Sequence, residues 1–208
     1  MDENIKVLDI VIPEEVEDVK LPSPELVKYY KDYDNRNITI DYDIDDSLFE
    51  VTKQILEYNR QDSGMSIEQR KPINIYVMSY GGDLYQAYAL ISTMLASKTP
   101  INAINMGVAM SAGLLILLAG HKRYAMKYST AMIHSGSGGT QGTYEQCEEQ
   151  QKNYKKLVDM MRNYILERTN IEVKLFKKQW TKDWYLTDKE QVELGIVSKI
   201  VENLDEII

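Results

Sequence analysis

Two short segments contain side chains that could together perform nucleophilic catalysis. Ser111 lies in residues 107–113 (GVAMSAG), between an apolar strand-like run and an apolar helical run. A serine at such a junction is ordinarily a helix N-cap. Here its small neighbours would leave room for a substrate backbone, and the N–H of Ala112 could face an oxyanion.

His134 follows the apolar residues 132–133 and opens a loop rich in glycine and serine. A lone histidine at a strand end is more often a structural residue than a base. If Ser111 needs an imidazole to take its proton, however, His134 is the only sensible supplier. The other histidine, His121, lies in a polar turn, where we expect it to be solvated.

A glycine pair, Gly81-Gly82, separates a β-rich run from a helical pattern. Glycines at such a junction let backbone N–H groups approach a ligand closely, and the start of the helix adds positive potential. The pair by itself is a weak signal, because it also fits an ordinary tight turn.

Composition excludes several classes of function. The net charge of −8 disfavours nucleic acid, which binds basic surfaces. Two histidines without metal-ligand spacing predict no metal, and the lack of a P-loop or GxGxxG motif predicts no nucleotide or other cofactor. The N-terminus does not resemble a secretory signal, the longest apolar run is too short to span a membrane, and Cys147 is the only cysteine. We therefore expect a cytoplasmic protein that does not associate with membranes.

Apolar periodicity predicts an α/β fold. Strand-like runs alternate with helical patterns from residue 73 onward, which favours right-handed crossovers and a largely parallel sheet. The expected strands are 37–43, 73–78, 101–106, 123–126, 130–133 and 196–201, and the expected helices are 47–59, a segment following residue 82, 111–119, 143–168 and 187–194. Asp45 or Asp46 is the expected N-cap of the first helix.

Two regions stand apart from this alternation. Residues 11–35 contain three prolines and no sustained period, so we expect an irregular arm, with one short strand at 5–12. The long helix at 143–168 has a narrow apolar stripe. It could project and pack against another chain, or it could lie over the sheet as an ordinary surface helix.

Several separated motifs, in the same order, resemble the ClpP family of serine peptidases. The resemblance lies in the glycine pair after a strand, the G-x-A-x-S-x-G segment at 107–113, and M-I-H at 132–134 with two glycines shortly after. It continues through D-W-Y-L-T at 183–187 and the glycine-containing segment at 190–197. The residues after His134 depart from the family, which usually has Gln-Pro where Ser135-Gly136 stand here.

The resemblance implies a ClpP/crotonase-like spiral of ββα units with a projecting handle helix. It also assigns a catalytic triad of Ser111 as nucleophile, His134 as general base and Asp183 as the group that orients the imidazole. The backbone N–H groups of Gly82 and Ala112 would form the oxyanion hole. Without the motif, Asp183 would be judged a surface acid.

At the level of function, the resemblance implies a serine endopeptidase that degrades proteins and peptides inside a ring-shaped chamber. Its partners would be copies of itself, in heptameric rings that stack into a tetradecamer, and an AAA+ unfoldase, which alone would use ATP. Residues 37–208 would be the peptidase domain. Residues 1–36 would be a divergent arm with an axial or docking role.

Three other readings remain open. The chain could be a non-catalytic or regulatory ring subunit, although an intact Ser, His and Asp set counts against that. It could be a phage-type maturation protease, which the unusual N-terminus allows. A crotonase-type acyl-CoA enzyme would share the spiral and the oxyanion hole, but its chemistry gives Ser111 and His134 no role.

Overall fold

Alternating strands and helices build a seven-stranded sheet, as the sequence pattern predicts. The computed structural model describes residues 22–207, so the strand expected at 5–12 lies outside the described residues. The strands are β1 (Asn37–Ile40), β2 (Ile73–Ser79), β3 (Ile101–Met110), β4 (Lys122–Ala125), β5 (Thr130–Ile133), β6 (Trp184–Leu186) and β7 (Lys199–Ile200).

The long strand β3 organises the sheet, because it pairs with different neighbours along its length. The main path runs β1-β2-β3-β4-β7, and β5 and β6 extend from β3 on a separate branch. The first half of β3 pairs with β4, and Val108–Met110 at its end pair with β5. All pairs are parallel except β5 with β6. The expectation of a largely parallel sheet is confirmed.

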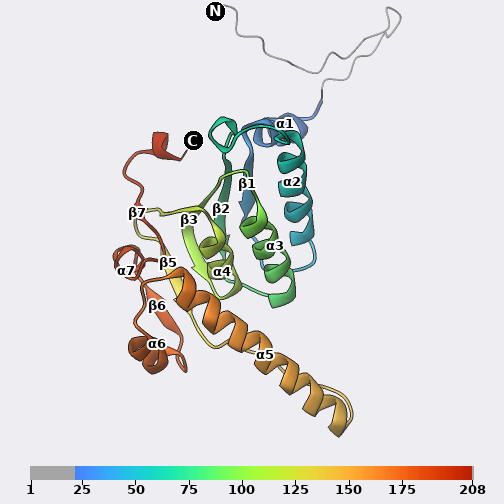
Figure 1. The fold of residues 1–208 in the computed structure, drawn as a ribbon, viewed down its shortest axis with the longest axis vertical. Coiled ribbons are helices and arrows are strands. Elements are labelled where there is room, and N and C mark those ends of the chain that lie inside the picture. The colour runs from blue at the N-terminus through green and yellow to red at the C-terminus, as the bar shows by residue number, and fades with distance from the viewer. Residues whose placement is uncertain (1–21, 208) are drawn as a thin grey trace, which may run out of the picture.

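Helices cover the sheet and extend beyond it (Figure 1). They are α1 (Pro24–Asn35), α2 (Leu48–Gln61), α3 (Leu84–Ala96), α4 (Ala112–Ala119), α5 (Tyr144–Arg168), α6 (Val173–Gln179) and α7 (Asp188–Glu193), with short 3-10 turns at Ile67–Gln69 and Leu204–Glu206. Each of α3, α5 and α7 begins where the sequence provides a capping side chain, from Asp83, Thr143 and Thr187 respectively.

Helix α4 is the centre of the hydrophobic core. All eight of its residues are buried, which is why its sequence is apolar on every side. Its last carbonyl groups cannot reach water, so α5 provides partners for them. Arg168 donates to the carbonyls of Leu118 (2.9 Å) and Gly120 (3.0 Å), and the Tyr164 hydroxyl donates to that of Leu115 (3.1 Å). Helix α4, which follows Ser111 directly, is thus a rigid element of the core.

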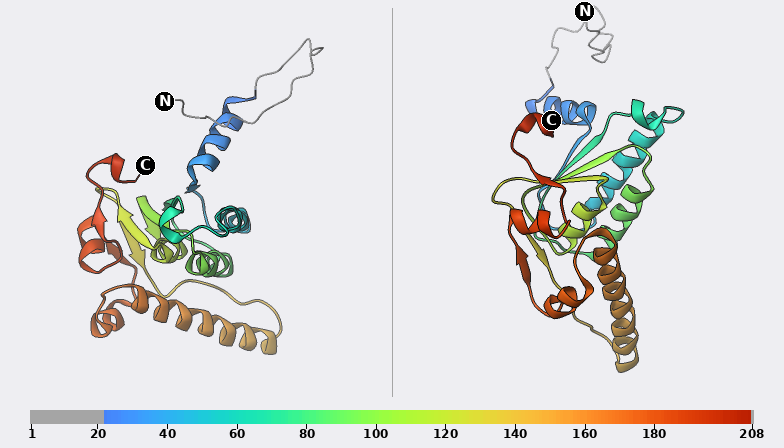
Figure 2. Two further views of the ribbon diagram at one scale, coloured as in Figure 1. Left: turned by 45° about the horizontal axis from the view of Figure 1, so that its top comes forward. Right: turned by 60° about the vertical axis from the view of Figure 1, so that its left-hand side comes forward.

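Helix α5 projects from the rest of the molecule, which decides between the two readings of this segment. It has 25 residues, of which only Met161 and Ile165, both near its C-terminal end, are buried. Figures 1 and 2 show its N-terminal half extending away from the sheet. The expected spiral with a projecting handle helix is confirmed.

Some local expectations were wrong. Residues 24–35 form helix α1 instead of an irregular arm, because Pro24 suits the first helical position and the Ser23 side chain caps the helix by accepting from the N–H of Leu26. The N-cap of α2 is Ser47, not Asp45 or Asp46; the Asp45 carboxylate instead binds the N–H and hydroxyl of Ser47. The last strand is also much shorter than expected.

Candidate active site

The carboxyl ends of β2, β3 and β5 bring the candidate catalytic residues together. Ser79 at the end of β2 pairs with Ala109 in β3, and Met110 at the end of β3 pairs with Met132 in β5. The next residues along these three strands are the glycine-pair loop, Ser111 and His134. In open α/β sheets, this edge is where ligands bind.

Ser111 has a strained backbone, and its side chain is half-buried. Its φ of 51° and ψ of −123° lie outside the regions that a serine usually adopts, at a cost of about 1–3 kcal/mol. Its N–H donates to the carbonyl of Met132 (3.0 Å), which fixes this conformation. The side chain makes no capping bond to α4. Its Oγ instead lies 2.7 Å from His134 Nε2.

Asp183 reaches the other side of the imidazole through the antiparallel pairing of β5 and β6. Ile133 pairs with Trp184, so the residues one step further, His134 and Asp183, also face each other. Asp183 Oδ1 lies 3.6 Å from His134 Nδ1, which is longer than a good hydrogen bond. The His134 side chain is 18% exposed and that of Asp183 is 59% exposed. The carboxylate end of the site is therefore open to solvent.

Gly81 packs directly against Ser111, and only a glycine can do so. Its φ is 111°, and a Cβ on it would lie 2.7 Å from the Cβ of Ser111 and 3.0 Å from the nitrogen of Ala112. Gly82 has a φ of 144° and lies against the backbone of Ile44. Ile44 donates its N–H to the Gly81 carbonyl (2.8 Å) and accepts from the N–H of Asp83 (2.8 Å). The glycine pair is thus fixed beside Ser111.

The two predicted donors of the oxyanion hole lie close to Ser111. Ala112 is the first residue of α4, where a backbone N–H has no partner within the helix and the helix dipole adds positive potential. Gly82 follows Gly81, whose backbone packs against Ser111 and Ala112. This arrangement can accept a proton from a serine hydroxyl and stabilise negative charge on an oxygen nearby.

Ser79 is a further residue of the site, and the sequence reasoning missed it. It is 1% exposed, its hydroxyl donates to the Tyr42 carbonyl (2.7 Å), and it accepts from the N–H of Gly81 (3.2 Å). Its backbone also packs against Gly113, where a Cβ would lie 2.9 Å from the Ser79 carbonyl oxygen. Ser79 therefore joins the glycine pair, α4 and the segment before α2. The only signal in the sequence was its position just before the glycine pair.

His121, the second histidine, has a structural role at the far end of α4. The residue is exposed, as expected, and its Nδ1 also accepts from the N–H of Ile101 (2.9 Å). Partial loss of water around the ring, with a smaller effect of the Arg168 charge, lowers its pKa below the ordinary 6.5. Across residues 22–207, no group of three or more potential metal ligands is found. No helix in the same part of the chain has the length and apolar character needed to cross a membrane.

Comparison with known proteins places this fold in a class. Residues 25–204 match the family model described as Clp protease. The chain belongs to the Clp protease family, and proteolysis is the function that this family membership supports.

Individual relatives agree with this assignment. The chain is 32% identical over 188 residues to ATP-dependent Clp protease proteolytic subunit 2 of Treponema denticola, which covers 84% of this chain and 94% of the relative. It is 31% identical over 159 residues to the protein of the same description in Bacillus licheniformis, covering 76% and 80%. The fold matches a ClpP1 mutant from Listeria monocytogenes with a TM-score of 0.74 and 24% identity, over 87% of this chain and 99% of that one.

The expected resemblance to ClpP is therefore confirmed, and so are the fold class and the general function. Family membership implies serine peptidase activity. It favours the peptidase reading over the acyl-CoA reading, in which the close contact between Ser111 and His134 would have no purpose.

Proposed function

We propose that this chain is a serine endopeptidase in which Ser111 is the nucleophile, His134 the general base and Asp183 the group that orients the base. The observation that carries this proposal is the 2.7 Å separation of Ser111 Oγ from His134 Nε2. A serine hydroxyl is a weak nucleophile until a base removes its proton, and that distance suits direct proton transfer.

The chemistry would proceed in two stages. As Ser111 Oγ attacks the scissile carbonyl, its proton passes to His134 Nε2, which requires the tautomer with a proton on Nδ1. Asp183, beside Nδ1, favours that tautomer and stabilises the imidazolium. His134 then gives its proton to the leaving amine, and a water molecule, activated by the same imidazole, hydrolyses the acyl-enzyme.

The backbone N–H groups of Gly82 and Ala112 would stabilise the tetrahedral intermediate. The negative oxygen forms only during the reaction, so fixed donors that face its position lower the barrier without any rearrangement. Losing one such donor typically costs about 3 kcal/mol. The strained Ser111 backbone and the Ile44 contacts to the glycine pair support this role, because they hold both donors in place before substrate arrives.

Assembly into rings is part of the proposal. Copies of the chain would form heptameric rings that stack around a chamber, in the cytoplasm, and an AAA+ unfoldase would use ATP to deliver substrates to it. The projecting α5 and the exposed Asp183 support this idea, because both present surfaces that a neighbouring copy could cover. The peptidase reaction itself would need no cofactor. Residues 1–36 would act as an axial or docking arm, with 37–208 as the peptidase domain.

Hydrolysis of short fluorogenic peptides by the assembled protein tests this proposal. Ser111→Ala and His134→Ala should each lower kcat/KM by about 10⁴-fold or more, because either change removes the nucleophile–base pair. Ser63→Ala, an exposed serine in the loop after α2, is the control and should keep parent activity. Full activity in Ser111→Ala would overturn the proposal. Complete inactivity of the parent assembly would favour a regulatory ring subunit instead.

A further inference from the structure

The sheet divides at a point where two buried amide side chains meet. Strand β3 pairs with β4 as far as Asn105 and with β5 from Val108 onward, so the β5–β6 branch leaves the main sheet between these residues. Asn105 and Gln191 of α7 are both fully buried there. Burial of an amide costs free energy unless hydrogen bonds replace those that it made to water. The two side chains must therefore find partners inside the protein.

Each of the two side-chain NH2 groups has two acceptors. Asn105 Nδ2 donates to Gln191 Oε1 (3.0 Å) and to the Thr130 carbonyl (3.1 Å) at the start of β5. Gln191 Nε2 donates to the Ser129 carbonyl (3.1 Å) and, more weakly, to that of Leu186 (3.5 Å) at the end of β6. The amide pair therefore connects the central strand and α7 to the base of the β5–β6 branch.

Asn105 also fixes a bulge in β3. Two steps along β2, from Val77 to Ser79, match four steps along β3, beginning at Asn105. Asn105 Oδ1 accepts from the N–H of Gly107, inside this bulge (3.1 Å). A bulge bends its strand locally, and here the bend lies where β3 leaves β4 for β5. One side chain thus holds both the bend and the start of the branch.

The β5–β6 branch carries both the candidate base and the candidate orienting carboxylate. His134 follows β5, four residues beyond Thr130, and Asp183 precedes β6, three residues before Leu186. Because β5 and β6 are antiparallel, both residues lie at the end of the branch opposite the amide pair. A strand rises about 3.3 Å per residue, so these separations correspond to about 10–13 Å. A change of angle at the base of the branch would therefore move the imidazole and the carboxylate.

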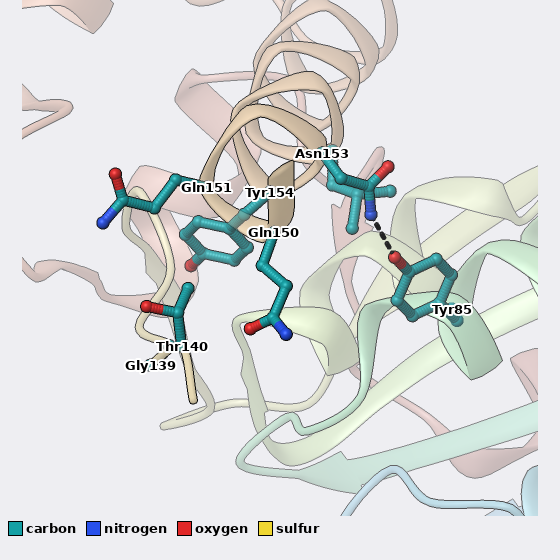
Figure 3. A pocket seen from close by; sticks show the side chains of 9 residues that line it. Tyr85, Gly139, Thr140, Gln150, Gln151, Asn153 and Tyr154 are labelled. Atoms are coloured by element: carbon teal, nitrogen blue, oxygen red, sulfur yellow. Dashed lines mark hydrogen bonds between the residues drawn. The ribbon is translucent and has the colours of Figure 1, made fainter. Parts of the chain in front are cut away.

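The loop after His134 is also held by α5. The Gln150 side-chain amide accepts from the Gln141 N–H (3.2 Å) and donates to the Gln141 carbonyl (3.1 Å). Figure 3 shows Gln150 extending from α5 toward this loop. Strand β6, by contrast, is three residues long, and the Asp183 side chain is mostly exposed. A shift at the base of the branch should therefore displace Asp183 more than His134.

We propose that Asn105 and Gln191 act as a positioning pair, which sets the separation of Asp183 from His134. The inference rests on the proposed peptidase function. A buried network whose hydrogen bonds are satisfied favours one arrangement of the strands that it connects. Without it, the branch would be free to adopt nearby angles, and Asp183 would face His134 Nδ1 less often. The pair lies away from the reacting atoms, so its effect on catalysis passes through Asp183.

Steady-state hydrolysis of a fluorogenic peptide by the assembled protein tests this inference in two backgrounds. Gln191→Met keeps the length of the side chain and removes its hydrogen-bonding groups. It should lower kcat about tenfold in the parent, because small displacements of a catalytic group are costly, and change KM by less than about twofold. In the Asp183→Asn background, where the carboxylate is already absent, it should lower kcat by less than about twofold. A pair with only a structural role would lower kcat equally in both.

Asn105→Ser breaks the same pair from its other side. A serine hydroxyl can still accept from the N–H two residues further on, at Gly107, but it is too short to reach Gln191. This variant should show the same dependence on Asp183 as Gln191→Met. Because both changes remove one network, the two together should cost no more in kcat than the larger single loss.

Asn59→Leu is the matched control. Asn59 Nδ2 also has two acceptors, the Ile55 carbonyl (2.9 Å) and the Ser97 hydroxyl (2.8 Å), but they lie in α2 and before the start of β3. This variant should lower the melting temperature and leave kcat unchanged in both backgrounds. In every variant, kcat is expressed per Ser111 that a fluorophosphonate labels, so that unfolded chains do not enter the comparison.

The outcomes separate the positioning pair from the proposed function. If Gln191→Met and Asn105→Ser lower kcat equally in the two backgrounds, or in neither, the positioning pair is overturned and the peptidase assignment stands. If Asn59→Leu lowers kcat with the same dependence on Asp183, the effect is not specific to the branch and the inference also fails. A parent whose hydrolysis does not require Ser111 rejects the proposed function and the positioning pair with it.

Discussion

The candidate triad is positioned firmly at one end, at Ser111, and loosely at the other, at Asp183. At one end, Ser111 and the glycine pair lie against a fully buried helix, and Met132 and Ile44 fix their backbones. At the other end, Asp183 is mostly exposed and lies 3.6 Å from the imidazole. The candidate nucleophile and the candidate oxyanion donors are therefore positioned by the core of a single chain. The position of the Asp183 carboxylate depends instead on the groups that surround it.

This difference follows from where each residue lies in the fold. Ser111 is at the end of the central strand β3, which has neighbours on both sides. Asp183 precedes the three-residue strand β6, which within residues 22–207 pairs only with β5, at the end of a branch. Strain at a residue such as Ser111 persists only where the surroundings determine its conformation fully. We expect mutations at the buried end to affect folding and catalysis together, and mutations at the exposed end to affect catalysis alone.

Gly81→Ala should have the largest effect. The added methyl group would collide with Ser111, and alanine is strained at a φ of 111°. We expect kcat/KM for peptide hydrolysis to fall by more than about 10²-fold, as for loss of an oxyanion donor, with a lower melting temperature. Gly64→Ala is the matched control, since its φ of 86° imposes similar strain and no atom lies within 4 Å. It should lower stability without lowering activity; equal losses of activity would contradict this account of the buried end.

Asp183→Asn should have the next largest effect, and it should be confined to catalysis. An amide cannot stabilise the imidazolium, so kcat should fall about 10²-fold, well below the loss of about 10⁴ seen for a buried triad carboxylate. The melting temperature should not change, because the side chain is mostly exposed. Steady-state kinetics and thermal melting check both statements. If kcat fell as far in Asp183→Asn as in Ser111→Ala, Asp183 would be positioned as firmly as Ser111, which would contradict this account.

Ser79→Ala should reduce activity about tenfold and stability by about 1–3 kcal/mol. It removes the acceptor of the Gly81 N–H and leaves the Tyr42 carbonyl without its donor. The fall should be in kcat more than in KM, because the hydrogen bonds position the glycine pair. Ser129→Ala removes an equally buried hydroxyl that has no partner among the described residues, so it should be neutral. Similar kinetics in the two variants would remove Ser79 from the site.

His121→Asn should have the smallest effect, visible only as a change in the pH dependence of stability. Because its folded-state pKa is lowered, the unfolded chain takes up this proton first as the pH falls. The stabilising contribution is complete above about pH 6.5 and decreases below it. Asparagine can accept the same hydrogen bond from Ile101 without titrating. The variant's melting temperature should therefore decrease less than the parent's between about pH 7 and pH 5; identical slopes would contradict this assignment.

Much of the fold and part of the site could be predicted from the sequence. The helical stripe after Gly81-Gly82 predicted α3, and the apolar run after Ser111 predicted α4. Both could be predicted because the local pattern of apolar residues indicates which side of a helix is buried. The candidate triad was predicted from the motif resemblance. Nothing local to Asp183 distinguished it from other surface acids, since its place beside His134 arises from the pairing of β5 with β6.

Other features depend on contacts between distant segments and could not be predicted. Ser79 and Tyr42 are far apart in the sequence, and the hydrogen bond between them has no sequence pattern. Helix α1 was missed because the three prolines of residues 11–35 suggested a loop. Pro24 in fact begins the helix, and Tyr33 packs on Tyr58 of α2. The exposure of Asp183 also follows from the short length of β6, and a three-residue strand is too short to show a periodic pattern in the sequence.

Identification of the residue that a fluorophosphonate modifies in the assembled protein tests the central claim most directly. The probe reacts only with a serine that a neighbouring base activates, and peptide mass spectrometry locates the adduct. The account predicts one adduct per chain, on Ser111, and its loss in His134→Ala. Modification of a different serine, or unchanged labelling of Ser111 without His134, would contradict it.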